Sequence, residues 1–331
     1  AKKVAEHLNT NHTELYVSAD DALSVVPLLP TLYDEPFGDS SQIPTYLVSK
    51  MAKEHVTVAL SGDAGDELFG GYNRHVNAPF LWKIISSIPK GLRPQISTLM
   101  NLTPDVFLNS FGNSLPGKYK TPFLAQKLSR FSERLETIEE ADDLYYNLVS
   151  EWKKPSEVLL NYEEPHSLLR DRSSWPKLDS FEDRMMYLDI MTYLPDDILV
   201  KVDRAAMAVS LETRAPFLDH RVIELSSRIP LKQKIHNGKG KQILRKLLYQ
   251  FVPKELIERP KQGFGVPLSD WLRGPLKGWS EELLEETKLE KEGFFNPKVI
   301  RGRWESHLKG KTNWEHSLWN VLMFQSWFES Q

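Results

Sequence analysis

Apolar residues recur at every third or fourth position through much of the chain, and this periodicity is typical of helices. Near the beginning of the sequence it predicts helices over 1–8, 20–33 and 43–54. Ser18 or Asp20 is placed to cap the second of these helices, because a short polar side chain accepts hydrogen bonds from the first backbone N–H groups. The helical spacing is already present at Val4, Ala5 and Leu8, so we expect an N-terminally truncated fragment.

Two segments show the pattern of strands instead. Thr13–Val17 alternates between polar and apolar residues, and Val56–Leu60 is a short run rich in β-branched residues, which predicts a buried strand. Two helical segments separate them, which predicts a βαβ-like unit with a parallel sheet. Because two strands are too few for a stable doubly wound sheet, we expect further strands upstream of Ala1.

The remainder of the chain is predicted to be mostly helical. Frequent prolines between residues 76 and 180 favour short helices and a variable lobe. One helix is predicted over 181–193, and another begins at Pro195, where the missing N–H group costs nothing. The tryptophans near the C-terminus, together with Trp152 and Trp175, are expected in the core or at its rim. We expect three parts: a partial α/β nucleotide-binding core (1–75), a helical variable region (76–180) and a helical region completing the active site (181–331).

The composition narrows the possible functions. The 331 residues carry a net charge of −3, which gives no reason to expect nucleic acid or an anionic membrane as a partner. No apolar run approaches the roughly 18 residues of a membrane span. The chain has 0 cysteines, so disulfides, thiolate metal sites and cysteine catalysis are excluded within it. We expect a cytoplasmic location and small-molecule substrates.

The first candidate site is the acidic, glycine-containing loop that follows Val56–Leu60. Gly62 and Gly65 allow the backbone to approach a ligand closely. Carboxylates are the ligands that suit Mg²⁺ held jointly with phosphate groups, and the loop supplies them at Asp63, Asp66 and Glu67. The alternative is an acidic turn in which Asp63 or Asp66 caps a helix.

Two basic turns form the second candidate. Gly238–Lys241 precedes a predicted helix, and cations at a helix start oppose its dipole, which favours an anionic partner there. Arg259–Gly265 is a basic loop whose glycines allow it to order on binding. The alternative for the first turn is a solvated basic surface.

Three further groups of polar residues leave a structural interpretation open. Ser40 and Ser41 precede the helix over 43–54, where they either cap it or border an anionic substrate. Lys201, with Asp203 and Arg204 beside it, is either part of a surface salt-bridge pattern or partly buried. Charges between residues 212 and 219 flank a proline turn and are interpreted first as an ion pair that holds the fold.

Four sequence blocks together resemble one family. They are Ser61–Tyr72 (SGDAGDELFGGY), Lys201–Asp219 (KVDRAAMAVSLETRAPFLD), Gly240–Arg245 (GKQILR) and Arg259–Pro267 (RPKQGFGVP). In this order they closely resemble the C-terminal synthetase domain of the glutamine-dependent asparagine synthetases. The resemblance implies an α/β fold with a parallel, doubly wound sheet of the adenine nucleotide alpha hydrolase type, incomplete here, and a large helical remainder.

The resemblance also implies a reaction and its residues. An ATP-dependent ligase of this family activates the carboxylate of aspartate as an acyl-adenylate, and ammonia then gives asparagine, AMP and pyrophosphate. The implied cofactors are ATP and Mg²⁺. The implied roles are catalysis for Asp63 and Lys261, binding of ATP or pyrophosphate for Ser61, Gly62 and Lys241, metal binding for Asp66, and a border of the substrate site for Ser40 and Ser41.

The same resemblance implies partners and alternatives. A glutaminase domain, absent from this sequence, would supply the ammonia, and the complete protein is expected to be a homodimer. The family's Ser-Gly-Gly-x-Asp-Ser pyrophosphate loop is also absent, so the isolated chain is expected to be inactive. One alternative is a related amidotransferase that acts on a sugar carboxylate for surface polysaccharides. The other is a non-catalytic helical scaffold.

Overall fold

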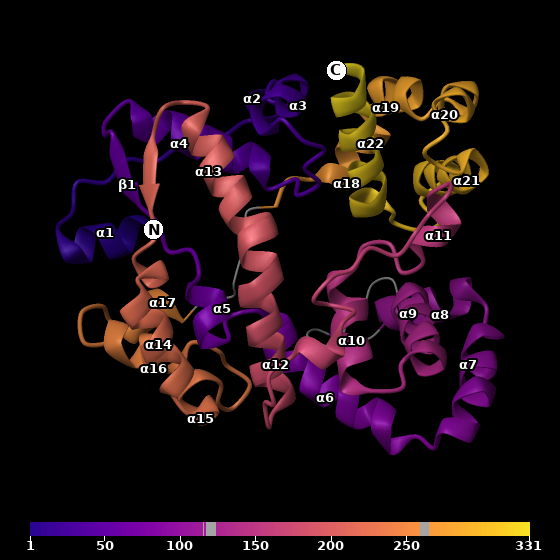
Figure 1. The fold of residues 1–331 in the computed structure, drawn as a ribbon, viewed down its shortest axis with the longest axis horizontal. Coiled ribbons are helices and arrows are strands. Elements are labelled where there is room, and N and C mark those ends of the chain that lie inside the picture. The colour runs from indigo at the N-terminus through magenta and orange to yellow at the C-terminus, as the bar shows by residue number, and fades with distance from the viewer. Residues whose placement is uncertain (115, 117–123, 259–264) are drawn as a thin grey trace. The chain divides into compact units, whose positions relative to one another are not determined.

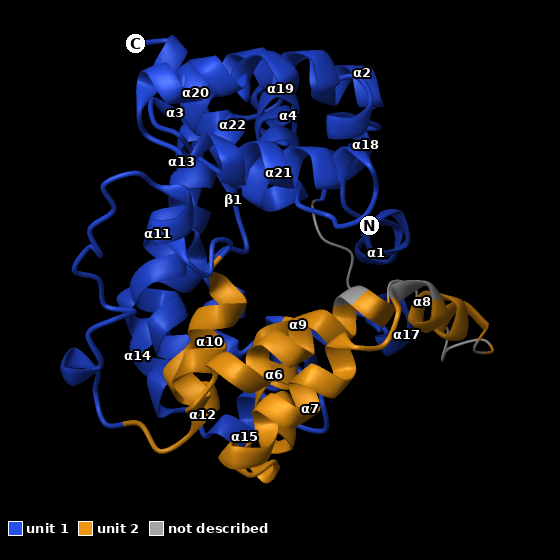
Figure 2. Cartoon of the chain, turned by 90° about the vertical axis from the view of Figure 1, so that its right-hand side faces the viewer, with its two compact units in different colours: residues 1–72, 151–177, 186–331 blue, residues 73–150, 178–185 orange. Residues whose placement is uncertain are grey.

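A computed structural model describes residues 1–114, 116, 124–258 and 265–331. Their contacts divide the chain into two compact units (Figure 2). Unit 1 contains residues 1–72, 151–177 and 186–331, and unit 2 contains residues 73–150 and 178–185. The division into 1–75, 76–180 and 181–331 stays a prediction.

Unit 1 is mostly helical and holds one small parallel sheet (Figure 1). In chain order its elements are α1 (Lys2–Leu8), α2 (Ala19–Leu23), η1 (Val26–Leu28), α3 (Leu29–Tyr33), α4 (Gln42–Lys53), β1 (Val58–Leu60), α5 (Gly65–Phe69), α11 (Pro155–Val158), η4 (Arg172–Ser174), η5 (Asp189–Leu199), α13 (Val200–Met207), β2 (Glu212–Arg214), η6 (Pro216–Leu218), α14 (His220–Arg228), α15 (Leu231–Lys234), α16 (Gln242–Leu248), α17 (Lys254–Ile257), α18 (Leu268–Arg273), α19 (Lys277–Leu283), α20 (Glu286–Glu292), α21 (Pro297–Leu308) and α22 (Glu315–Glu329).

All regular elements in the described part of unit 2 are helices. It contains α6 (Asn73–Ser87), η2 (Lys90–Leu92), α7 (Arg93–Asn101), α8 (Asp105–Ser114), α9 (Leu124–Thr137), α10 (Ala141–Val149) and the first turns of α12 (Phe181–Leu188). The buried guanidinium of Arg93 donates hydrogen bonds to the carbonyls of Ile85, Ile88 and Ile138. This one side chain therefore ties the ends of α6 and α9 to the start of α7.

The sheet differs from the predicted one. β1 pairs in parallel with β2, with Val58 opposite Glu212 and Leu60 opposite Arg214 (Figure 1). The sequence analysis placed charges flanking a proline turn at residues 212–219 and predicted no strand there, so β2 is a correction. The predicted strand over 13–17 is also wrong: these residues are all exposed and form no strand. The structure is thus α/β in a coarse sense, with a small parallel sheet and many helices.

The prediction that Val56–Leu60 is a buried strand is wrong for the described residues. Val58 is 39% exposed and Leu60 is 75% exposed. The apolar run indicated the strand correctly, but burial depends on what packs against its faces. Within the described residues, only β2 pairs with it.

Two of the helices predicted near the start of the chain are confirmed, whereas the predicted helix over 20–33 is divided into α2, η1 and α3. α1 and α4 match 1–8 and 43–54, and the Ser18 side chain accepts a hydrogen bond from the Asp21 backbone N–H as the predicted cap of α2. The predicted start of a helix at Pro195 is wrong. Pro195 lies inside η5, a π-helix that continues directly into α13 (Figure 1). The wider turn accommodates a residue that cannot donate a backbone hydrogen bond.

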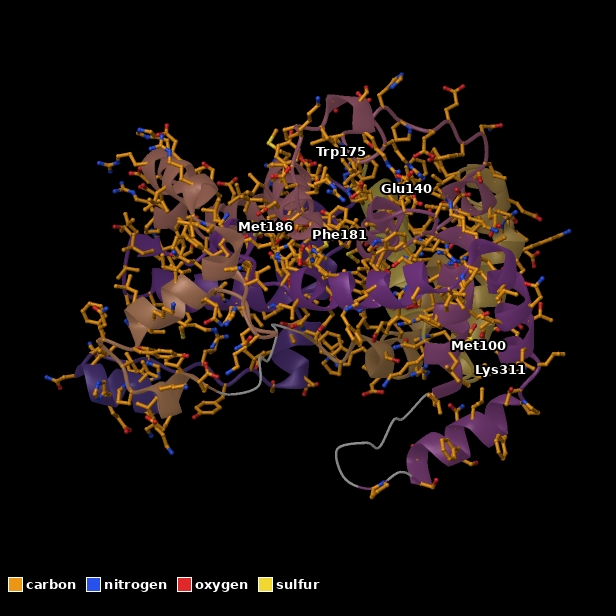
Figure 3. All side chains as sticks on the ribbon, turned by 90° about the horizontal axis from the view of Figure 1, so that it is seen from below. Met100, Glu140, Trp175, Phe181, Met186 and Lys311 are labelled. Carbon is orange, nitrogen blue, oxygen red and sulfur yellow. The ribbon has the colours of Figure 1, made fainter. Side chains whose placement is uncertain are left out.

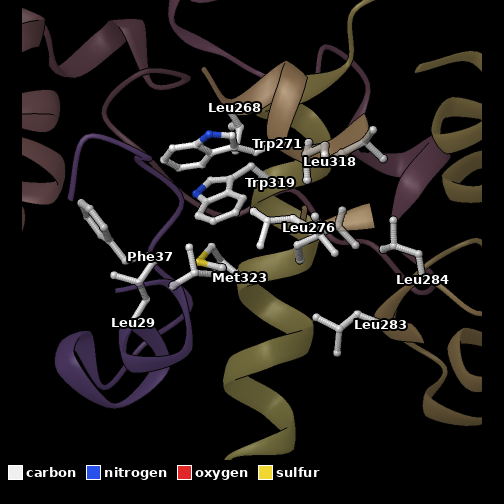
Figure 4. Close-up of a cluster of buried hydrophobic side chains, with 14 of the residues drawn as sticks. Leu29, Phe37, Leu268, Trp271, Leu276, Leu283, Leu284, Leu318, Trp319 and Met323 are labelled. Carbon is white, nitrogen blue, oxygen red and sulfur yellow. The ribbon is translucent and has the colours of Figure 1, made fainter. Parts of the chain in front are cut away.

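The main core of unit 1 gathers helices from both ends of the chain. Trp304 and Trp319 are fully buried, as the sequence predicted for the tryptophan-rich C-terminal part. Figure 4 shows Trp319 and Met323 of α22 on the side of the cluster where Leu29 and Phe37 lie. Trp175, labelled in Figure 3, is half-buried, and its indole N–H donates to the Leu168 carbonyl at 2.6 Å. It therefore lies at the rim, as predicted.

Arg303 of α21 lies between two indole rings in unit 1. Its guanidinium carbon is 4.0 Å from the ring centre of Trp152 and 4.3 Å from that of Trp314. A guanidinium against an indole face is attracted by the ring quadrupole, and its planar shape stacks well. The three side chains therefore fasten the segment around Trp152 to the C-terminal helices.

We expect Arg303→Ala to lower the free energy of unfolding by about 2 kcal/mol, since two cation–π contacts and their packing are lost. Arg303→Lys keeps the charge but loses the planar stack, so it should fall between wild type and Arg303→Ala. Urea titration followed by tryptophan fluorescence measures both. Equal stability of all three proteins would contradict the stacking account.

Candidate functional site

The candidate site begins where β1 ends. The backbone N–H of Ser61 donates to the carbonyl of Arg214 at 2.9 Å, which extends the parallel pairing by one step. Gly62 is exposed, and a side chain built there would meet no atom within 4 Å. Ser61 and Asp63 are half-buried. The end of this strand therefore presents a small-residue loop on the surface of unit 1.

The loop turns into α5 without a side-chain cap. Ala64 takes a left-handed conformation, with φ of 69°, at the N-cap position. The alternative in which Asp63 or Asp66 caps the helix is therefore wrong. α5 packs between other elements of unit 1, and its buried residues Leu68 and Phe69 contact residues of η5, η6, α14 and α16. This packing fixes the direction of the acidic turn.

Asp66 and Lys241, which come from distant parts of the sequence, form an ion pair. The Lys241 Nζ atom is 3.0 Å from Asp66 Oδ1, and their side chains are 30% and 26% exposed. Lys241 itself has a left-handed backbone, with φ of 55°, and its N–H donates to the Phe69 carbonyl at 3.0 Å. The structure thus brings together a predicted metal ligand and a predicted phosphate-binding cation.

Two glycines make this contact possible. A Cβ atom at Gly71 would lie 1.9 Å from Asp66 Oδ1 and 2.3 Å from Lys241 Cε. A Cβ atom at Gly240 would lie 1.9 Å from the Gly70 carbonyl oxygen. A larger residue at Gly71 would displace the Asp66 and Lys241 side chains, and one at Gly240 would push its turn away from the Gly70 backbone.

Glu67, the third acid of the loop, points into the protein. It is 1% exposed, and its carboxyl accepts a hydrogen bond from the hydroxyl of Tyr72. Burial raises the pKa of Glu67, and burial beside the Glu67 carboxyl raises the pKa of Tyr72. Tyr193 of η5 packs edge-on against Tyr72, with ring centres 5.6 Å apart. These contacts pack the turn after α5 against the interior of unit 1.

Ser40 and Ser41 lie in another polar group of unit 1. Ser40 is buried, and Ser41 donates its N–H and hydroxyl to the Asp39 carboxylate at 2.9 and 2.8 Å. Lys201 completes this group, with Nζ 2.6 Å from Asp39 Oδ2. Ser41 stands at the N-cap of α4 without a capping hydrogen bond from its side chain, so the capping interpretation is wrong for it.

The other charged residues divide between surface and interior. Lys201 is buried, while Asp203 and Arg204 are exposed, so only Lys201 has the partly buried structural role left open by the sequence. Glu212 and Arg214 form an exposed ion pair at 2.7 Å. The proline turn after them does lie against α5, because Phe217 packs on Phe69 with ring centres 5.8 Å apart.

Lys261, the predicted catalytic lysine, lies outside the described residues, as does the rest of 259–264. Within the ranges that the structure describes, no group of three or more His, Asp or Glu side chains is arranged to hold a metal. Likewise, no helix there has the length and hydropathy needed to cross a bilayer. One residue that the sequence did not suggest, Glu258, binds the turn that carries Lys241.

Comparison with known proteins decides the family. The sequence pattern of the family described as asparagine synthase matches residues 1–329. The chain belongs to the asparagine synthase family. The resemblance drawn from the four sequence blocks is therefore confirmed at the level of the family.

The names of two relatives that match nearly the whole chain agree with this assignment. The chain is 32% identical to asparagine synthetase [glutamine-hydrolyzing] 1 of Bacillus subtilis over 331 residues, which are 99% of the chain and 49% of that protein. A Mycobacterium bovis protein, provisionally named a glutamine-hydrolyzing asparagine synthetase, is 30% identical over 333 residues, covering 98% of the chain and 47% of that protein. A Gibberella zeae protein named amidase chry2 is 32% identical over 115 residues, covering 33% of the chain and 17% of that protein.

The chain thus spans about half the length of the first two relatives. Both members of the Asp66–Lys241 pair lie in the part of the chain that matches the asparagine synthase family. The Asp66 carboxylate already contacts a cation, the Lys241 ammonium, and remains partly exposed. A single carboxylate of this kind fits Mg²⁺ when phosphate oxygens and water supply the remaining ligands.

Proposed function

We propose that the full-length protein is an ATP-dependent ligase that amidates a carboxylate through an acyl-adenylate. The acceptor that we propose is aspartate, which gives asparagine with ammonia derived from glutamine, and AMP and pyrophosphate leave. The observation that carries the proposal is the contact between Asp66 and Lys241 in a chain of the asparagine synthase family. A carboxylate beside an ammonium group suits a ligand that carries both Mg²⁺ and phosphates.

In this proposal the reaction needs activation, because a carboxylate is a poor electrophile. One carboxylate oxygen of the acceptor attacks the α-phosphorus of ATP, and the bond from that phosphorus to the pyrophosphate oxygen breaks. Ammonia then attacks the activated carbonyl carbon, and the bond to the AMP oxygen breaks. Negative charge develops on the departing phosphates, so preorganised cations lower the barrier.

The residues take separate roles. Lys241 and Lys261 bind the phosphates as compact positive charges. Asp66 would hold Mg²⁺, and the bound ion would neutralise the pyrophosphate. Ser61 and Gly62 lie where the strand ends and contact the nucleotide through backbone and hydroxyl groups, and Asp63 acts as the base or orients ammonia. Ser40 and Ser41 border the acceptor.

The exposed apolar side chains of β1 support the assignment of a larger, doubly wound parallel sheet. Val56, Val58 and Leu60 alternate along one side of the strand segment and are 45%, 39% and 75% exposed. Apolar residues in this pattern are suited to packing in a larger parallel sheet. We propose that in the complete protein this strand belongs to a larger doubly wound sheet whose helices cover these side chains. We also propose that the complete protein is a cytoplasmic homodimer with a glutaminase domain.

Formation of AMP by the full-length gene product, with ATP, Mg²⁺ and glutamine, tests the function. We expect AMP formation to depend on aspartate and not on uronic acids, and Lys261→Ala to lower it by about 100-fold or more. Dependence on a uronic acid instead would replace aspartate by a sugar carboxylate. Absence of ATP–Mg²⁺ binding by calorimetry would favour the non-catalytic scaffold and overturn the proposal.

A further inference from the structure

Glu258 gathers donors from three nearby side chains of unit 1. Its carboxylate accepts hydrogen bonds from the ammonium of Lys239, from Arg245 Nη1 at 2.8 Å and from the Tyr249 hydroxyl at 2.5 Å. Hydrogen bonds from Lys239 and Tyr249, with the charges of Lys239 and Arg245, lower the pKa of Glu258 to about 2. The group is therefore ionised and fully paired at neutral pH.

The donors of Glu258 also bind the turn that carries Lys241. Arg245 Nε donates to the Gly240 carbonyl at 3.1 Å, while Nη1 of the same guanidinium donates to Glu258. Lys239, on the other side of Gly240, pairs through its backbone with His236. The Glu258 carboxylate thus links Lys239, which precedes Gly240, to Arg245, which donates to the Gly240 carbonyl.

This turn needs such support. Lys241 has φ of 55°, which a side-chain-bearing residue adopts only when its surroundings impose it. Gly240 must also stay close to the Gly70 carbonyl for the Lys241 N–H to reach Phe69. If the turn relaxed, the Lys241 ammonium would move away from Asp66.

We propose that Glu258 is a positioning residue for Lys241: by joining Lys239 and Arg245, it holds the strained turn that directs the Lys241 ammonium toward Asp66 and the phosphates. This inference rests on the proposed function of Lys241. It assigns to Glu258 no contact with substrate. Its effect on catalysis passes through Lys241 alone.

A double-mutant cycle in the full-length gene product tests the inference. Glu258→Gln leaves two cations without their carboxylate, and we expect it to raise KM for ATP by about 10-fold. In a Lys241→Met background, the same Glu258→Gln substitution should change KM for ATP by less than about 2-fold, because its route of action is already removed. Glu255→Gln is the matched control, since Glu255 lies on α17 and is exposed.

The outcomes separate the two proposals. Equal effects of Glu258→Gln in both backgrounds would show a general loss of structure and overturn the positioning role, as would an unchanged KM in the otherwise wild-type protein. If Lys241→Met itself left ATP binding unchanged, the proposed function of Lys241 would fail, whatever Glu258 does. Urea titration of each variant detects a loss of stability, which a positioning effect on KM does not require.

Discussion

Replacing Lys241 by methionine is expected to lower kcat/KM for ATP in the full-length protein by about 100-fold. Methionine keeps an unbranched side chain as far as Cε and removes the ammonium, so the loss measures a preorganised charge directed at the phosphates. Steady-state rates of AMP formation give the value. Lys246→Met is the matched control, because Lys246 lies on α16, the helix that Lys241 precedes, and is exposed.

The Asp66–Lys241 ion pair predicts the direction in which each substitution changes ligand affinity. Asp66 and Lys241 neutralise each other at 3.0 Å, so each competes with a ligand of the other. Lys241→Met should therefore bind Mg²⁺ more tightly in the absence of nucleotide, and Asp66→Asn should bind metal-free ATP more tightly than wild type does. Calorimetry measures both. Weaker binding in both cases would mean that the two residues do not share one ligand site.

The largest effect on stability is expected for Asp39→Asn. Lys201 is only 10% exposed in its side chain and lies 2.6 Å from Asp39, so the substitution leaves a nearly buried ammonium without its main partner. Removing one member of a buried pair costs several kcal/mol, and the Asp197 carboxylate at 3.8 Å offsets part of this loss. We expect the free energy of unfolding to fall by about 3 kcal/mol.

The pH dependence of this effect follows from the carboxyl group. Burial disfavours the charged form of Asp39, but the Lys201 ammonium and the N–H and hydroxyl of Ser41 outweigh it and lower its pKa. The pair therefore stabilises the fold fully above the unfolded pKa of about 3.9, and this stability is lost as the pH falls through the lowered folded value. Asp39→Asn should remove this part of the acid sensitivity.

A double substitution separates charge from packing. Asp39→Asn combined with Lys201→Met should recover much of the lost stability, because the nearly buried ammonium that lost its main partner is then removed as well. Glu224→Gln is the control: its partner Arg228 is 3.9 Å away on an exposed surface, and we expect a change below about 0.5 kcal/mol. Urea titrations at neutral pH and at a pH well below about 3.9, where this stability is being lost, measure all four proteins. If Asp39→Asn behaved like Glu224→Gln, the pair would have no structural weight.

Much of the local structure could be predicted because its signals lie within a few residues of one another. The helices over 1–8 and 43–54, the cap at Ser18 and the strand at Val58–Leu60 all follow from spacing and residue type. The prediction of a strand at Thr13–Val17 was wrong because it rested on local alternation alone. Alternation indicates a strand only where a partner is present, and a local pattern does not contain the partner.

The sequence by itself determined the family and the candidate residues, since the blocks around Asp66 and Lys241 are specific as short strings. Tertiary structure decided which candidates meet. It pairs β1 with Glu212–Arg214, joins Asp39 to Lys201 across 162 positions and sets Lys241 against Asp66. It also turns Glu67 inward and recruits Glu258. The physical reason is that periodicity and motifs record local preferences, whereas contacts between distant residues depend on the packing of the whole unit.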